Sequence, residues 1–158
     1  MKKINIALIL IVFLGAVSCK KTLTPGNTAG VKAANGWWVT FTQNGSDVFG
    51  LGTFFLNTYN TSEGDDSLWV DDLGNSWDFK CKAKVDYSNL TFSTPNSQNQ
   101  YYDIQVTLAD GKILSKAGRS KSGNSTDSIY FKATFSDDPT DTFIISGTAR
   151  TGFIEDDY

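Results

Sequence analysis

The sequence of 158 residues contains no histidine. That absence excludes catalytic centres with histidine as general base, such as Ser-His-Asp and Cys-His, and every metal site with an imidazole ligand. Glutamate occurs twice and methionine once, so two residues that favour helices are scarce. Proline occurs three times and cysteine twice. The length is that of one domain, and 40% hydrophobic residues is typical of a globular protein.

Small polar residues take the place of the missing helix formers. The chain has 15 Ser, 17 Thr, 11 Asn and 14 Gly, a composition typical of strands joined by turns. Aromatic residues make up 13% of the chain. The composition therefore predicts an all-β protein and says little about chemistry.

The first residues resemble a bacterial lipoprotein signal. Lys2 and Lys3 precede an apolar run that is shorter than a membrane-spanning helix. The run ends in Gly-Ala-Val-Ser before Cys19, a pattern similar to a lipobox, in which the enzyme cuts before a lipidated cysteine. We therefore expect a signal peptide over 1–18 and a lipid anchor on Cys19; plain secretion is the alternative.

A tether over 19–35 is expected to follow the anchor, because this segment has no aromatic residue and no periodicity. Lys20 and Lys21 stand where surface-exported lipoproteins of the Bacteroidetes type carry acidic residues. This favours an outer-membrane lipoprotein that faces the periplasm. Residues 19–158 carry 12 basic and 17 acidic side chains, net charge -5, and have no basic patch suited to nucleic acid.

Alternation of apolar and polar residues predicts strands in the remaining segment, 36–158. The clearest case runs from Trp77 to Tyr87, with one apolar and one charged face. Cys81 lies on the apolar face and is expected to be a small buried hydrophobe. The other strands are expected near 37–43, 47–57, 67–72, 90–93, 104–108, 129–135 and 142–150.

Turn signals separate these strands. Asp110-Gly111 predicts a hairpin turn, Pro95 begins a polar loop, and 116–127 is the longest polar connection. Eight or nine strands with short connections must close or stack to remove their edges. A closed up-and-down barrel fits best, with a β-sandwich as the alternative. Such a barrel holds a small ligand when its inward side chains leave room.

Several segments together resemble a known family. They are Trp37-Trp38-Val39, Asn57 to Thr61, Leu68 to Asp72, Trp77 to Lys80, Thr126 to Phe131 and Ile145 to Phe153. In order and spacing they are similar to small Bacteroidetes lipoproteins known as lipid-binding putative hydrolases. The resemblance spans Trp37 to Tyr158 and implies a lipocalin-like, calycin-type barrel.

The residues offer no recognisable catalytic constellation to match the word hydrolase. Without histidine, a serine nucleophile needs a lysine base, and the nearest cluster, Ser120-Lys121-Ser122, lies in a polar loop. Asp pairs at 65–66, 71–72, 137–138 and 156–157 are typical of solvated turns and lack calcium-ligand spacing. We therefore expect no catalytic residue, no metal and no cofactor.

Aromatic residues are the better candidates for ligand contact. Adjacent pairs such as Trp37 and Trp38 put one ring on each face of a strand, so only one can be core. Arg150 has three competing roles: a buried pair with an Asp such as Asp72, a cation over a Trp, or capture of an anionic head group. The candidate ligand-contact residues are Trp37, Trp38, Trp69, Trp77, Phe79, Tyr101 and Arg150.

The sequence thus predicts an outer-membrane-anchored, non-catalytic protein whose barrel binds a small apolar or amphiphilic, lipid-like ligand. The alternative is a module that binds glycans or proteins through exposed aromatics. A hydrolase, as the family name suggests, is the third reading.

Overall fold

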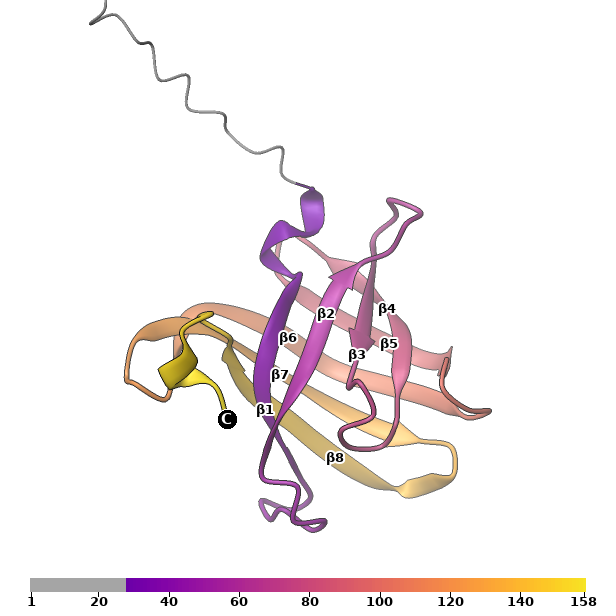
Figure 1. Cartoon of the computed structure of the whole chain (residues 1–158). Helices are drawn as coiled ribbons and strands as arrows, with labels where there is room; N and C mark the ends of the chain where they lie inside the picture. The colour runs from indigo at the N-terminus through magenta and orange to yellow at the C-terminus, as the bar shows by residue number, and fades with distance from the viewer. Residues whose placement is uncertain (1–27) are drawn as a thin grey trace, which may run out of the picture.

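A computed structural model describes residues 28–158, which form a closed antiparallel barrel (Figure 1). Each strand pairs with the next, and the last pairs back on the first. The strands are β1 (Asn35–Thr42), β2 (Thr53–Asn60), β3 (Ser67–Asp71), β4 (Lys80–Asp86), β5 (Thr91–Gln98), β6 (Gln105–Arg119), β7 (Ser125–Phe135) and β8 (Asp138–Ala149). The 3-10 helices η1 (Ala29–Lys32) and η2 (Ile154–Asp156) flank them. The predicted lipocalin-like barrel is confirmed, and the chain does not form the alternative sandwich.

The predicted signal peptide, Cys19 and residues 19–27 of the tether lie outside the described residues. Within 28–158, no helix is long and apolar enough to cross a membrane.

Alternation fills the interior with large apolar side chains. Trp37 is fully buried while its neighbour Trp38 points outward, as the doublet argument predicts. Phe54 and Phe55 divide in the same way. The fully buried aromatic side chains are Trp37, Phe41, Phe79, Phe131, Phe135 and Phe143. Each such side chain stabilises the fold by about 1.5–3 kcal/mol, and together they belong to one apolar core cluster.

β1 pairs with β8 and so closes the barrel, and one of the paired residues of β8 is a glycine. Gly147 lies opposite Val39, and a Cβ there would stand only 1.9 Å from the carbonyl oxygen of Trp38. The two backbones therefore approach too closely for any side chain at this position.

Several strand boundaries differ from the prediction. The strand predicted from Trp77 to Tyr87 begins only at Lys80. Asp78 has a positive φ of 52°, which breaks the extended backbone before that residue. Gly50 and Gly52, with φ of 66° and 64°, keep the segment before β2 in a loop. Residues 96–98, expected in a loop after Pro95, belong to β5.

The predicted hairpin turn at Asp110-Gly111 is wrong. β6 continues through these residues, and its register shifts between Ala109 and Lys112 against β7 and between Leu108 and Gly111 against β5. Asp110, with φ 55°, is therefore part of a β-bulge. The expected loop over 116–127 is also mostly strand, with the turn confined to residues 120–124.

The barrel has two ends that the loops define. At the η1 end, residues 28–34, expected as tether, pack on the barrel: Ala33 is buried, and its carbonyl oxygen accepts a hydrogen bond from Thr58 Oγ1. Trp37 Nε1 donates to the same Thr58 oxygen at 2.8 Å. The loops 43–52, 72–79, 99–104 and 136–137 follow the opposite strand ends.

Candidate aromatic site at the mouth of the barrel

Five aromatic rings gather at the end of the barrel away from η1. We call this cluster the aromatic mouth; it consists of Phe41, Phe49, Trp77, Phe135 and Phe143. Trp77 stacks on Phe135 with 4.7 Å between centroids and a 6° interplanar angle. Phe41 stacks on Phe143 at 4.6 Å. These contacts make the mouth a continuous apolar surface that leads from the core outward.

Phe49 lies outermost in the aromatic mouth and is 51% exposed. Its ring centroid lies 5.9 Å from Phe41, 5.7 Å from Trp77 and 5.8 Å from Phe143. It belongs to the exposed β1–β2 loop, where Val48 is also 47% exposed. An exposed aromatic seated on buried rings is the kind of surface that an apolar ligand covers.

Trp77 is held at the rim by a polar anchor. Its Nε1 donates to Asp137 Oδ1 at 3.2 Å. The hydroxyl of Tyr102 donates to the other carboxylate oxygen of Asp137 at 2.9 Å. Burial, together with this hydrogen bond, raises the pKa of Tyr102 to about 12, so the phenol stays protonated and keeps donating.

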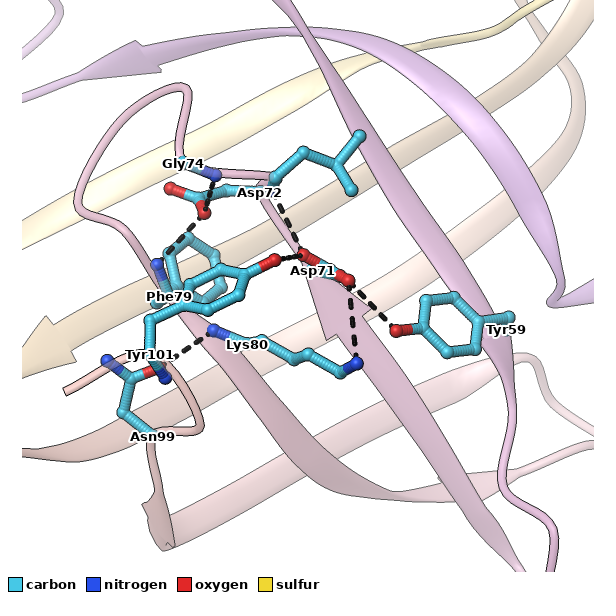
Figure 2. Close-up of polar contacts among 9 residues, drawn as sticks. Tyr59, Asp71, Asp72, Gly74, Phe79, Lys80, Asn99 and Tyr101 are labelled. Carbon is cyan, nitrogen blue, oxygen red and sulfur yellow. Dashed lines mark hydrogen bonds and ion pairs between the residues drawn. The ribbon is translucent and has the colours of Figure 1, made fainter.

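Asp72 shapes the β3–β4 loop that carries Trp77, and Figure 2 shows its hydrogen bonds with Gly74 and Phe79. This fully buried carboxylate accepts hydrogen bonds from five groups of its own loop: the backbone N–H groups of Gly74, Ser76, Trp77 and Phe79, and the hydroxyl of Ser76. Burial raises the pKa of Asp72 against the opposing effect of these bonds. Asp72 therefore fixes the backbone from which Trp77 reaches the mouth.

Asp71 ties the same loop to the outer face of the sheet (Figure 2). Tyr59 and Tyr101 both donate hydroxyl hydrogen bonds to it, at 2.8 and 2.6 Å. Lys80 Nζ lies 3.9 Å from its carboxylate. Burial, followed by the hydrogen bond to Asp71, raises the pKa of Tyr101 well above its usual value. Asp71 and these three partners therefore support the β3–β4 loop from its first strand.

The predicted ligand-contact residues do not form one site. Trp77 and Phe79 lie at the mouth end, Phe79 being fully buried with its ring 5.5 Å from Phe135. Trp37 is in the core near η1. Trp69 lies on the outer face, where two ammonium groups, Lys80 and Lys82, stand 5.3 and 5.4 Å from its ring centroid.

Trp38 and Arg150 form a fourth group, on the outer face around Asp157. Arg150 Nε donates to Asp157 at 2.7 Å, and its guanidinium lies 5.8 Å from the ring of Phe55. The suggested pair with Asp72 is therefore wrong: Asp72 is occupied by its own loop, and Arg150 is an exposed side chain. Trp38 Nε1 also donates to Asp157.

Two hollows open on the described surface, and neither contains the aromatic mouth. The larger, about 640 Å³, lies on β4 to β7 and is lined by charged side chains such as Lys84 and Lys112 and by the core side chains of Val85 and Phe92. The smaller, about 170 Å³, lies beside η1 and the β2–β3 loop. Neither hollow includes any of the five rings of the aromatic mouth.

The serine–lysine cluster considered for catalysis is a structural turn. The Ser120 hydroxyl accepts from the backbone N–H of Asn124 and lies 3.2 Å from the Ser122 hydroxyl. Lys121 Nζ instead donates to the carbonyl oxygen of Asp157 at 2.9 Å. Cys81 is buried as predicted, and burial raises the pKa of its thiol far above the usual value, which keeps it unreactive.

Sequence reasoning missed Phe49, Tyr102 and Asp137 as parts of the site. Phe49 was assigned to a strand over 47–57, although it lies between an Asn-Gly turn and two glycines. An apolar Val-Phe pair inside a glycine-rich segment is the signal that would have identified Phe49 as an exposed loop residue.

The closed barrel and its aromatic mouth define a small lipocalin-like protein with an apolar contact site at one end. Residues 22–154 match the family described as lipid-binding putative hydrolase, so the chain belongs to this family. A search of curated proteins found no match.

Proposed function

We propose that this protein binds a small apolar or amphiphilic, lipid-like ligand at the aromatic mouth without catalysis. The observation that carries the proposal is Phe49, half exposed on a loop yet packed at tilted or edge-on angles against three rings of the cluster. The family description, which names lipid binding, supports the same ligand class. The ligand would cover Phe49 and lie against the other rings of the aromatic mouth.

The two other readings have less support. Glycan stacking needs an open aromatic face, but the ring of Trp38 packs on Phe55 and Tyr158, and Trp69 lies below two lysines. Hydrolysis through Ser120 needs a base in reach of its hydroxyl, and Lys121 is turned toward Asp157 instead.

The cellular setting is part of the proposal. We propose an outer-membrane lipoprotein, anchored through Cys19 and facing the periplasm; the lipobox-like sequence and Lys20-Lys21 support it. β1 leads from the η1 end to the mouth over eight residues, about 26 Å at 3.3 Å per residue. An anchor that precedes η1 would leave the mouth at the far end of the barrel.

Titration with the neutral fluorescent probe N-phenyl-1-naphthylamine tests the binding site. Wild-type protein should show saturable binding with one site per chain. Phe49→Asp places a charge in the mouth and should weaken binding at least tenfold with little change in the unfolding midpoint, because the side chain is half exposed. Phe153→Asp is the matched control, since Phe153 is 59% exposed in the C-terminal segment. Equal affinity of Phe49→Asp and wild type would place the site elsewhere.

A further inference from the structure

The loops that surround the aromatic mouth share one sign of charge. The four loops 43–52, 72–79, 99–104 and 136–137 each contain at least one aspartate, and none contains a lysine or arginine. The aspartates in these loops are Asp47, Asp72, Asp78, Asp103 and Asp137. Four of them are exposed, and Asp72 is buried in its loop. An apolar surface with a rim of carboxylates is complementary to a cation that carries an apolar group.

Two of the exposed aspartates follow the rim aromatics directly in sequence. Asp78 comes after Trp77, and Asp103 comes after Tyr102. Asp103 accepts a hydrogen bond from the neutral amide of Gln98. The lysine nearest to Asp78 in sequence is Lys80, which lies outside the β3–β4 loop. Its ammonium group faces Asp71. The negative charge at the rim is therefore not balanced by a cation of these loops.

Asp137 adds a carboxylate in contact with the aromatic mouth itself. Both of its hydrogen-bond donors, Trp77 Nε1 and the Tyr102 hydroxyl, are neutral groups, so neither donor brings a positive charge to this carboxylate. Aromatic faces next to carboxylates are the surroundings that ammonium groups prefer, because both attract a cation. A free carboxylate or phosphate would be repelled by the same rim.

We infer that the ligand of the aromatic mouth is a cationic amphiphile, with an ammonium head at the aspartate rim and an apolar chain on the rings. This inference rests on the proposed binding function and specifies its ligand class. It predicts an order of affinity for ligands that share one chain and differ in head-group charge.

Three probes with the same twelve-carbon chain test the inference: dodecyltrimethylammonium, dodecyl maltoside and dodecanoate. Each is titrated below its micelle concentration by displacement of the neutral fluorescent probe. At low salt, dodecyltrimethylammonium should bind about fivefold more tightly than the uncharged dodecyl maltoside. Dodecanoate should bind about fivefold more weakly than dodecyl maltoside. High salt should narrow both differences, because screening weakens interactions between exposed charges.

A double variant assigns the preference to the rim. Asp78→Asn with Asp103→Asn should lower the affinity for the cation about fivefold and raise that for dodecanoate. The control Glu63→Gln with Asp66→Asn removes the same net charge from the β2–β3 loop at the η1 end, where both side chains are exposed. The control should keep the wild-type order.

The outcomes separate the two proposals. If no probe binds, the proposed function fails. If dodecanoate binds as tightly as the cation, or if control and rim variants respond alike, the cationic preference is overturned while binding at the mouth stands.

Discussion

At the scale of single residues, the position of a side chain on its strand decides which face it occupies, and its hydrogen-bond partners decide which segment it holds. The Trp37-Trp38 doublet predicted one buried and one outward ring, because neighbouring residues of a strand face opposite sides. The partner of Arg150 could not be predicted in the same way. Asp72 and Asp157 are both aspartates in the sequence, but only the structure shows that five groups of its own loop occupy Asp72.

Asp72→Asn should destabilise the protein by about 2–4 kcal/mol. The amide offers one acceptor oxygen and turns an NH₂ group toward backbone donors, so several of the five hydrogen bonds are lost in a buried place. Urea unfolding measures the change, and probe affinity should fall as the loop of Trp77 loosens. Asp66→Asn, an exposed control, should unfold like wild type. A loss below about 0.5 kcal/mol would contradict the positioning role.

Asp156 should make the free energy of unfolding depend more steeply on pH in the acid range. Hydrogen bonds from Ser122 and Thr151 hold its pKa well below the ordinary value of 3.8. A lowered pKa in the folded state gives stability that is present above pH 3.8 and is lost as the pH falls below it. Asp156→Asn should therefore be less stable than wild type at neutral pH, and the difference should shrink below pH 3.8.

Unfolding midpoints measured from neutral to acid pH check this prediction. Glu155→Gln, an exposed neighbour in η2, is the control for removing a charge from the C-terminal segment. A wild-type and Asp156→Asn difference that stays constant across the acid range would contradict it.

At the scale of elements, the alternation of apolar and polar residues predicts where the strands lie. The local turn signals, in contrast, misplace several strand ends. Asp110-Gly111 has the sequence of a hairpin turn, yet β5 and β7 pair with β6 on both sides of it and hold it as a bulge. The alternating apolar pattern begins at Trp77, but the positive φ of Asp78 turns the backbone and delays the start of the strand. Long-range pairing decides these boundaries, and a single sequence does not contain it.

Gly147→Ala should destabilise the barrel by about 3 kcal/mol. The added methyl group would meet the Trp38 carbonyl and the Val39 Cα, both backbone atoms, and would force β1 and β8 apart. Thermal unfolding measures the loss. Ser146→Ala on the adjacent, outward-facing position of β8 is the control and should stay close to wild type. Wild-type stability of Gly147→Ala would show that the seam between β1 and β8 can widen freely.

At the scale of the whole molecule, the barrel could be predicted because sheet edges must be removed. The ligand site could not, since the aromatic mouth combines side chains of β1, β7 and β8 with two loops. The candidates chosen for residue type alone therefore lie in four separate places. Only closure of the barrel brings Phe49, Trp77 and Phe135 together.

The two ends of the barrel should act independently in the anchored protein. Cys19→Ala should abolish incorporation of labelled palmitate and move the protein from the detergent to the aqueous phase, because the proposed anchor is lost. Its affinity for the neutral probe should stay within twofold of wild type, since β1 places the mouth about 26 Å beyond η1. Phe49→Asp should show the reverse: normal lipid labelling and weakened probe binding. Palmitate label on Cys19→Ala would contradict the anchor, and a joint loss of both properties in either variant would contradict the independence of the two ends.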